Sequence, residues 1–343
     1  MHVQGVIFGK NFHWESTRSG TYPGKFICLS NPAEDGVQII NELFLEKYIE
    51  SVVASEMNPN APTEFIRAHA IISRTWSLRK LIGFRPSNKG RINGKEEIST
   101  WQESDAHSYF NVCSDDHCQR YQGICSNEKF ISTVLEPVKG MVLLDSEKMP
   151  ADTRFSKCCG GETEIFSTCW AREDYPYLTH LSDPYCNPEI LETSKREEFI
   201  KTILKDYDYK TEYYKWKVKV PRSLISQNLF TLYSVNIGDI KDLIPLKRGP
   251  SGRIYKMLIK GSEGEIIVGK ELTIRRLLSS SHLLSSAFNI VENNGEYFVL
   301  EGRGWGHGVG LCQIGAATMA YKGFSAEEIL SFYFSNTILK KIY

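Results

Sequence analysis

The sequence has no excess of charge of either sign, because 41 lysines and arginines balance 41 aspartates and glutamates in 343 residues. This balance argues against a dedicated nucleic-acid-binding protein, which normally carries a basic excess or stripe. No run approaches the roughly 20 consecutive apolar residues that span a bilayer. Hydrophobic residues make up 41% of the chain and charged residues 24%, which excludes a disordered chain. At about 100–200 residues per domain, the length allows two domains.

The chain also lacks a fixed-period repeat, and residues 1–10 lack the charged start and apolar centre of a secretory signal peptide. Either the protein is cytosolic or its export signal is missing from this sequence. Nine cysteines are an odd number, and they are too few for a disulfide-rich miniprotein. Their roles therefore depend on where they lie in the chain.

Hydrophobic spacing predicts a helical hairpin early in the chain. Apolar residues recur at helical intervals from Phe44 to Met57 and again from Phe65 to Trp76. The proline-containing tract 58–62 ends the first helix, because proline removes a donor and restricts the residue before it. Two helices joined by so short a tract should pack against each other.

The rest of the chain is mostly β-like. The first forty residues, 131–145, 150–156 and 212–275 have short apolar or alternating patterns typical of strands, whereas 83–100 resembles a loop and 194–204 a short helix. We therefore predict an α+β fold with a helical hairpin and a β-rich catalytic domain. This domain is discontinuous, over residues 1–190 and 283–343, and a smaller β-rich domain is inserted at 191–282.

Residues 302–310 place glycine at every second position, with Arg303, Trp305 and His307 between the first four. In an extended strand all five glycines would share one face, where a ligand or another backbone can approach closely. One interpretation is a tightly packed strand-to-helix corner. The other is a wall facing a ligand, and the three larger side chains would then suit a sugar or an anionic polymer. The pattern is not a dinucleotide fingerprint, which needs a surrounding βαβ unit.

Glu56 lies in the last turn of the first predicted helix, which is otherwise apolar. The helix macrodipole disfavours a carboxylate at this end, and partial burial would raise its pKa. Both effects favour the protonated form that a general acid needs near neutral pH. The alternative is an exposed glutamate at a fraying helix end.

His107, Cys113, His117 and Cys118 fall within twelve residues of polar chain. Thiolates and imidazoles at such spacing can form a tetrahedral zinc site, with Cys125 nearby as a spare ligand. A disulfide between Cys113 and Cys118, or unrelated thiols, is the rival interpretation. We favour a metal because the two histidines are otherwise unexplained.

Cys158 and Cys159 precede two glycines at the end of a predicted strand. Either cysteine could form a disulfide with Cys169 or Cys186 in an oxidising compartment. A catalytic cysteine is a weaker interpretation of the same residues.

Taken together, these segments resemble the SpoIID/LytB family, named for a sporulation cell-wall protein and an amidase enhancer. The resemblance rests on residues 45–75 around the Ser-Glu-Met stretch, on 155–163 with its Gly-Gly pair, and on 302–315 with its Trp-Gly-His-Gly core. The last block is the most specific. The sequence departs from the family at Lys157-Cys158-Cys159, where a Ser/Thr-rich approach to the two glycines is usual.

The resemblance implies a lytic transglycosylase that cleaves MurNAc-GlcNAc strands of peptidoglycan and leaves 1,6-anhydroMurNAc ends, with Glu56 as the general acid/base. It also implies zinc bound by His107, Cys113 and Cys118, with His117 or a water as the fourth ligand. The expected contacts with glycan come from the matching blocks: Arg74, Gly160, Gly161, Thr163, Arg303, Trp305, His307 and Gln313.

Such an enzyme would act in the cell envelope, periplasmic or extracytoplasmic, so the absent export signal would reflect a trimmed start. Its partners would be peptidoglycan glycan strands and a cell-wall amidase, not nucleic acid. One alternative is a non-catalytic, glycan-binding enhancer of such an amidase. Another is a hydrolase in which Glu56 works with a second acid, Glu162 or Asp152.

Overall fold

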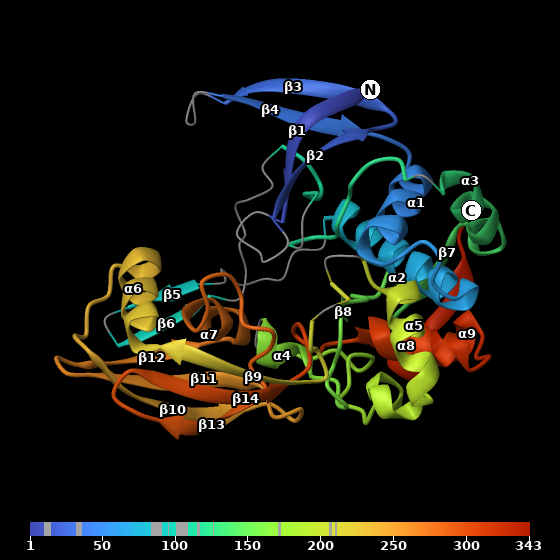
Figure 1. Ribbon diagram of the computed structural model, residues 1–343. Coiled ribbons are helices and arrows are strands. Elements are labelled where there is room, and N and C mark those ends of the chain that lie inside the picture. The colour runs from blue at the N-terminus through green and yellow to red at the C-terminus, as the bar shows by residue number, and fades with distance from the viewer. Residues whose placement is uncertain are drawn as a thin grey trace.

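The computed structural model describes residues 1–9, 15–31, 36–83, 91–94, 96–100, 109–114, 117–125, 127–170, 173–205, 208–209 and 211–343. Helices and several small sheets are mixed along these residues, which confirms the predicted α+β fold class. Figure 1 shows N-terminal strands at the top, most helices at the right and the larger sheets at the lower left.

Two antiparallel hairpins form the β-like start of the chain. β1 (His2–Phe8) pairs with β2 (Ser16–Thr21), and β3 (Lys25–Asn31) pairs with β4 (Gly36–Glu42). The ring of Tyr22, directly after β2, lies 5.8 Å from the ring of Tyr121, between centroids. Aromatic contacts therefore join the hairpins to the rest of the fold.

The predicted helical hairpin is present, formed by α1 (Leu45–Glu56) and α2 (Thr63–Leu81). Pro62 immediately precedes α2, a position where its fixed backbone angle suits a helix start. Almost all of α2 is buried, because α1, α8 (Gln313–Tyr321) and α9 (Ala326–Tyr333) pack around it. This helix is consequently the centre of the first hydrophobic core.

Residues 131–145 are not a continuous strand as predicted. α3 (Glu128–Leu135) occupies the first part, and only β7 (Met141–Leu144) is extended, paired with β16 (Ile338–Lys341). Ile131, Val134 and Leu135 are the buried residues of α3, and this spacing marks one helical face. A short apolar run of this kind does not distinguish a strand from a helix.

The middle of the chain contains small elements. The strand expected at 150–156 is limited to β8 (Phe155–Ser156), which pairs in parallel with β15 (Leu311–Cys312). The predicted helix at 194–204 is α5 (Thr193–Ile203). The remaining helical pieces are α4 (Phe166–Cys169) and the 3-10 turns Glu136–Val138, Pro184–Cys186 and Pro188–Ile190.

A second hydrophobic core lies between two sheets and two helices. The three-stranded sheet consists of β13 (Phe288–Asn293), β14 (Tyr297–Arg303) and β9 (Lys215–Pro221). The five-stranded sheet consists of β10 (Ile240–Arg248), β11 (Ile254–Gly261), β12 (Glu265–Gly269), β6 (Glu97–Thr100) and β5 (Arg91–Asn93). α6 (Arg222–Tyr233) and α7 (Glu271–Leu277) complete this region, visible at the lower left of Figure 1.

This region differs from the prediction in two places. Residues 91–100, expected in a loop, supply β5 and β6, and β6 pairs in parallel with β12. Residues 222–233, expected in a β pattern, form α6, whose buried residues Ile225 and Leu229 are one helical turn apart. The second core combines Ile98 with residues 216–300, and a domain boundary at 191–282 stays a prediction.

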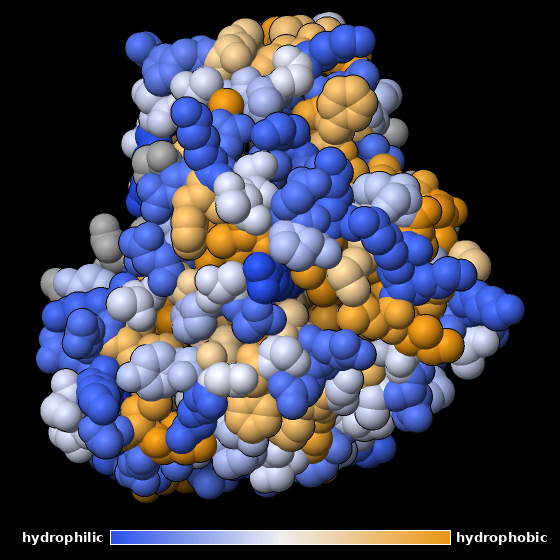
Figure 2. Space-filling view, turned by 90° about the vertical axis from the view of Figure 1, so that its right-hand side faces the viewer, coloured by the Kyte–Doolittle hydropathy of each residue, from blue (hydrophilic) through white to orange (hydrophobic). Residues whose placement is uncertain are grey.

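None of the helices in the described part of the chain is both long enough and apolar enough to cross a bilayer. The face that carries the helices at the right of Figure 1 is turned toward the viewer in Figure 2. Apolar residues gather there at several places between hydrophilic ones. The exposed apolar side chains of the described residues include Phe44 and Phe130.

Candidate functional site

Glu56 is the last residue of α1 and is only 6% exposed. Its Oε1 atom accepts a hydrogen bond of 2.8 Å from the backbone N–H of Arg120. The Arg120 side chain in turn contacts Asp208, with 3.3 Å between Nη1 and Oδ2. Glu56 is therefore held inside the fold and is not the exposed glutamate of the alternative interpretation.

Lys157 connects Glu56 to the glycine-rich C-terminal block. Its Nζ donates to the backbone carbonyl of Glu56 at 2.9 Å and lies 3.6 Å from Oδ2 of Asp208. The same Nζ is 6.0 Å from the centre of the Trp305 ring. The backbones of Cys158 and Trp305 exchange hydrogen bonds of 3.0 and 2.8 Å. Three segments far apart in sequence thus meet at the end of α1.

Three further side chains lie at this site and were not predicted from the sequence: Arg120, Asp208 and Lys205. Lys205 donates to the carbonyl of Ala54, and burial lowers the pKa of this lysine to about 8. Asp208 lies within a stretch of tyrosines and charged residues that contains no motif. No sequence signal places these side chains near Glu56, because only the folded chain brings them together.

The predicted metal ligands Cys113, His117 and Cys118 are close together, with their donor atoms within 4.8 Å of one another. Nδ1 of His117 is 3.9 Å from Sγ of Cys113 and 3.6 Å from Sγ of Cys118. Cys113 and Cys118 are not joined by a disulfide. His107 lies outside the described residues. Two thiols and an imidazole in this arrangement fit zinc, which binds soft thiolate and nitrogen ligands.

The residues directly after this cysteine cluster run along α1. Two positions after Cys118, the N–H of Arg120 donates to Glu56. The N–H of Gln122 donates to Oγ of Ser55 at 3.0 Å. The position of the Glu56 carboxylate therefore depends on a segment that begins at the candidate metal ligands.

The glycine-alternating block is not an extended strand. β14 ends at Arg303, and the glycines at 304, 306, 308 and 310 have φ of +78°, +98°, +77° and +72°. These angles lie in a region that side chains other than glycine rarely adopt. The backbone therefore turns repeatedly after Arg303, and the glycines do not form the single face that was expected of an extended strand.

Close packing against Arg253 explains one of these glycines in detail. A Cβ at Gly308 would lie 2.4 Å from Cζ of Arg253. That guanidinium is fully buried, and it donates to the carbonyls of Gly306 and Cys159 at 3.2 Å each. Of the two interpretations of the glycine pattern, a tightly packed corner therefore describes the backbone around Gly308, and a wall facing a ligand does not.

The three larger side chains of the block have different surroundings. Arg303 donates from Nη2 to the carbonyl of Ser251 at 2.9 Å and lines a surface pocket. Trp305 is only 8% exposed. Nδ1 of His307 accepts from the N–H of Val309 at 3.0 Å, and burial lowers the pKa of this histidine well below its ordinary value. Of the three, Arg303 is the one that faces a pocket.

Three other predicted substrate-binding side chains make internal contacts. Arg74 is fully buried and donates to both carboxylate oxygens of Glu46, at 2.7 and 2.8 Å. The hydroxyl of Thr163 donates to the backbone carbonyl of Thr179 at 3.0 Å. The side-chain amide of Gln313 lies 2.9 Å from Nε2 of His69. In this conformation all three side chains hold the fold together.

The Gly160-Gly161 pair forms the predicted turn, with φ of +79° and +98°. A Cβ at Gly160 would lie 2.8 Å from the backbone nitrogen of Gly304. The second and third blocks of the resemblance therefore touch through their glycines.

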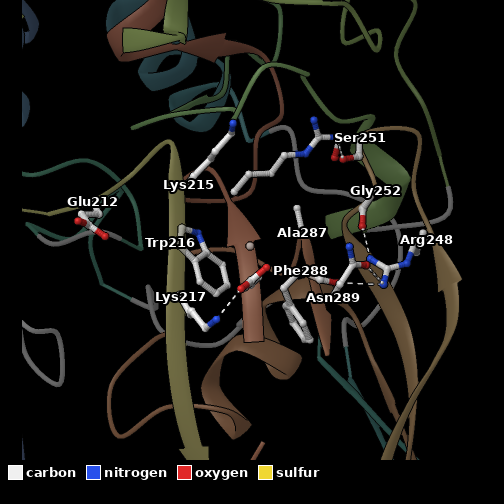
Figure 3. Close-up of a pocket in the computed structure, with 13 residues that line it drawn as sticks. Glu212, Lys215, Trp216, Lys217, Arg248, Ser251, Gly252, Ala287, Phe288 and Asn289 are labelled. Carbon is white, nitrogen blue, oxygen red and sulfur yellow. Dashed lines mark hydrogen bonds and ion pairs between the residues drawn. The ribbon is translucent and has the colours of Figure 1, made fainter. Parts of the chain in front are cut away.

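An open pocket of about 660 Å³ lies at the edge of the second core. Trp216 and Lys217 lie on one side and Arg248 on the other, with Ala287 and Phe288 between them (Figure 3). Its lining also includes Glu212, Lys215, Ser251, Gly252, Asn289, Glu301, Gly302 and Arg303. The two aromatic residues of the lining, Trp216 and Phe288, are buried in the second core, so the exposed character of the pocket comes from its charged and polar side chains.

Comparisons with known proteins agree with the resemblance. Residues 33–144 match a family model described as stage II sporulation protein, and 164–310 match a domain of unknown function. Stage II sporulation protein D of Bacillus subtilis is 25% identical over 305 residues, 88% of this chain and 75% of its own length.

Two further relatives align over similar lengths. An uncharacterised protein of Brachyspira hyodysenteriae is 26% identical over 309 residues, 89% of this chain and 68% of its own length. The amidase enhancer of Bacillus subtilis is 25% identical over 312 residues, which are 85% of this chain but 40% of the enhancer. These matches confirm the resemblance to the SpoIID/LytB family, with a stage II sporulation protein domain over residues 33–144 and similarity to its relatives over most of the chain.

Proposed function

We propose that this protein is a peptidoglycan lytic transglycosylase of the cell envelope, with Glu56 as its general acid/base. The names of its relatives, a sporulation protein and an amidase enhancer, support a role in the cell wall. One observation carries the enzymatic part of the proposal. Glu56 is a buried carboxylic acid that the N–H of Arg120 orients, next to Lys157 and the Trp305 block.

A single carboxylic acid is sufficient for this reaction. Hydrolytic glycosidases usually need two carboxylates, one of which activates water or forms a covalent intermediate. In a lytic transglycosylase the C6 hydroxyl of the muramyl residue attacks its own C1. The bond from C1 to the glycosidic oxygen breaks while the bond from C1 to O6 forms. Glu56 gives its proton to the leaving oxygen and takes the proton of the C6 hydroxyl, so it returns to its starting state.

The carboxylates around Glu56 support this mechanism over a hydrolase pair. Glu162, one of the two predicted partners, accepts from His180 at 2.7 Å on the surface, and Asp152, the other, pairs with Arg154 at 3.0 Å. Asp208 is nearer in the contact network, but it is paired with two cations. Asp208 therefore holds the side chains of Arg120 and Lys157 in place by ion pairs.

The proposal includes one structural zinc ion held by Cys113, His117 and Cys118, while His107, also in the predicted ligand set, lies outside the described residues. Zinc would bind the two thiolates and the imidazoles in a closed tetrahedral arrangement. The ion would fix Cys118, and the N–H of Arg120, two residues later, orients Glu56 by its hydrogen bond to Oε1.

For the substrate, we propose that glycan strands contact the pocket that Trp216 and Arg303 line. The lysines and arginines around this pocket offer donors to hydroxyl and carboxylate groups, while Trp216, only 5% exposed, supports the pocket wall from the core. Arg303 lines this pocket, and two residues later in the chain the centre of the Trp305 ring is 6.0 Å from Nζ of Lys157.

The decisive experiment compares Glu56→Gln with Glu50→Gln on the same helix. Both variants are incubated with purified glycan strands, and released 1,6-anhydromuramyl products are quantified by mass spectrometry. Loss of general acid/base catalysis should reduce the rate by about 10²–10⁴-fold in Glu56→Gln, and Glu50→Gln should keep full activity. Circular dichroism melts check that both variants fold. Full activity of a folded Glu56→Gln protein would reject the assignment, and reducing ends in place of anhydro ends would indicate a hydrolase.

The second candidate function is a non-catalytic enhancer that binds glycan and stimulates a cell-wall amidase. The relation to the amidase enhancer favours it. Under this hypothesis the purified protein yields no anhydro products alone, yet it accelerates an added amidase on intact peptidoglycan. Glu56→Gln would then stimulate the amidase as well as the unchanged protein does.

A further inference from the structure

A second group of cysteines lies inside the fold, separate from the cluster at residues 113–118. Sγ atoms of Cys159, Cys186 and Cys312 and a carboxylate oxygen of Asp183 all lie within 4.8 Å of one another. Each of the four residues is at most 1% exposed. They come from the turn after β8, from a 3-10 turn and from the end of β15, so the fold itself gathers them.

The distances within this group fit a shared metal ion. Sγ of Cys159 is 3.4 Å from Sγ of Cys186 and 3.2 Å from Oδ2 of Asp183. A tetrahedral zinc ion separates two sulfur ligands by ~3.8 Å and a sulfur from an oxygen ligand by ~3.5 Å, given bonds of about 2.3 and 2.0 Å. These two separations are shorter by ~0.4 Å at most, and all the donors lie within 4.8 Å of one another, so small side-chain shifts would place them around one ion.

Backbone N–H groups point at the sulfur atoms. Cys159 donates to Sγ of Cys312 at 3.2 Å, and Gly161 donates to Sγ of Cys186 at 3.0 Å. Gly315, in the first turn of α8, also donates to Sγ of Cys312 at 3.4 Å. Such donors stabilise sulfur in the thiolate form, which is the form that binds metal.

The carboxylate is oriented in the same manner. Asp183 accepts from the hydroxyl of Tyr333 at 2.9 Å and from the N–H of Tyr185 at 3.0 Å. A Cβ at Gly315 would lie 2.5 Å from Oδ2 of Asp183, so glycine is needed for α8 to approach. In the described part of the chain its hydrogen-bond donors are neutral groups, the third being the Cys159 thiol. A fully buried carboxylate usually requires a cation, and a metal ion would supply it.

We propose that Cys159, Asp183, Cys186 and Cys312 form a second, structural zinc site with three thiolates and one carboxylate. Soft thiolates select zinc over magnesium or calcium, and four protein ligands in a buried setting are typical of a structural ion. The ion ties the double-glycine turn, which follows Lys157, to the start of α8. The proposal is independent of the catalytic activity, because it concerns metal content alone.

Elemental analysis of three proteins tests this site. Cys113→Ser/Cys118→Ser removes the first cysteine cluster, and this double variant should retain about one zinc per chain. Adding Cys312→Ser should reduce zinc to background. Adding Cys169→Ser is the matched control, since Cys169 is buried but its thiol contacts the carbonyl of His307. Absence of zinc from the folded double variant, or equal loss with Cys169→Ser, would overturn the proposal.

A measurement on the unchanged protein avoids variants that fail to fold. The protein is denatured with a chelator but without reductant, and its thiols are alkylated and counted by mass spectrometry. The metal site predicts labelling of all nine cysteines. A disulfide that joins two of the three cluster cysteines would leave seven labels and would exclude the site. Replacement of zinc by Co²⁺ should also give sulfur-to-cobalt charge transfer, and a spectrum without it in the double variant would contradict the three-thiolate set.

Discussion

The Nζ atom of Lys157 donates a hydrogen bond of 2.9 Å to the backbone carbonyl of Glu56, across 101 residues of chain. This bond reaches one of the last carbonyls of α1, which have no partner within the helix. It also places a positive charge beside the helix end, where the macrodipole favours it. Lys157, the first of the three residues that depart from the family pattern before the double glycine, thus holds the C-terminal end of α1.

Asp208 holds the two cations of this site together, and its replacement should destabilise the protein. Asp208→Asn keeps the shape but removes the charge that pairs with Arg120 and Lys157. Breaking a buried ion pair costs about 3 kcal/mol or more, because the remaining charges stay desolvated. Urea denaturation should show this loss. Glu197→Gln, which breaks an exposed pair with Lys201, should leave the free energy of unfolding almost unchanged, because water screens this pair. Equal effects of both variants would contradict the buried network.

The glycine block offers a test in which close contact and backbone angle are separated. Gly308→Ala introduces a Cβ 2.4 Å from Cζ of Arg253 at a φ of +77°. Gly323→Ala has a φ of +94° but open space around the new Cβ, and Gly295→Ala has open space without a positive φ. Backbone strain alone costs about 1–2 kcal/mol.

The expected order of destabilisation is therefore Gly308→Ala above Gly323→Ala above Gly295→Ala. The first should exceed the second by several kcal/mol, since both the glycine backbone and a buried guanidinium must move. Thermal melts of the three variants give this order. A Gly308→Ala protein as stable as Gly323→Ala would show that the contact with Arg253 is not a tight one.

Acid should destabilise the protein through His69. This histidine is buried on α2 beside Gln313, Ser73 and Phe155, and burial together with Lys157 lowers its pKa to about 3. The unfolded chain binds a proton at this residue below about pH 6.5, whereas the folded protein does so only near pH 3. The free energy of unfolding therefore falls as pH decreases through this window.

Between pH 7.5 and 4.5 the contribution of His69 should amount to about 2–3 kcal/mol. His69→Gln, which keeps a polar side chain toward Gln313, should reduce the pH dependence by that amount. Urea denaturation at both pH values measures it for the two proteins. His307 has a lowered pKa as well, but it is present in both and cancels in the difference. Identical pH dependence would mean that His69 titrates normally.

The sequence was sufficient to predict elements whose pattern is local. The spacing of apolar residues located α1 and α2, and the prolines between them placed the turn. The sequence was insufficient where a partner distant in the chain determines the secondary structure of a segment. β6 is a strand because β12 lies beside it, about 170 residues later in the chain, and no pattern at 97–100 indicates this.

The site shows the same division. The position of Glu56 at a helix end is a local property, and the structure adds that this residue is buried. Five alternate glycines suggested a strand because the pattern has the period of a strand. The backbone instead has four positive φ angles, which glycine also permits. The glycine pattern alone does not distinguish an extended strand from a series of turns. The turns pack around Arg253, which is about fifty residues away in the chain.

Removal of the zinc site proposed at Cys113, His117 and Cys118 should loosen the segment that orients Glu56. Cys118→Ser removes a thiolate from the group with Cys113 and His117. We expect the loss of about one zinc per chain and a faster amide hydrogen exchange of Arg120 and Gln122, because ligand loss at one end frees the chain that follows.

The activity of Cys118→Ser should fall about tenfold or more, since supporting contacts of a metal site typically matter by about 10–100-fold. Cys125→Ser is the matched control, because this nearby cysteine is not part of the group with Cys113 and Cys118. It should keep the zinc content, the slow exchange and the activity. If Cys118→Ser lost its zinc but kept slow exchange at Arg120, the metal would not position Glu56. The hydrogen bond from Arg120 would then depend on the packing of α1 alone.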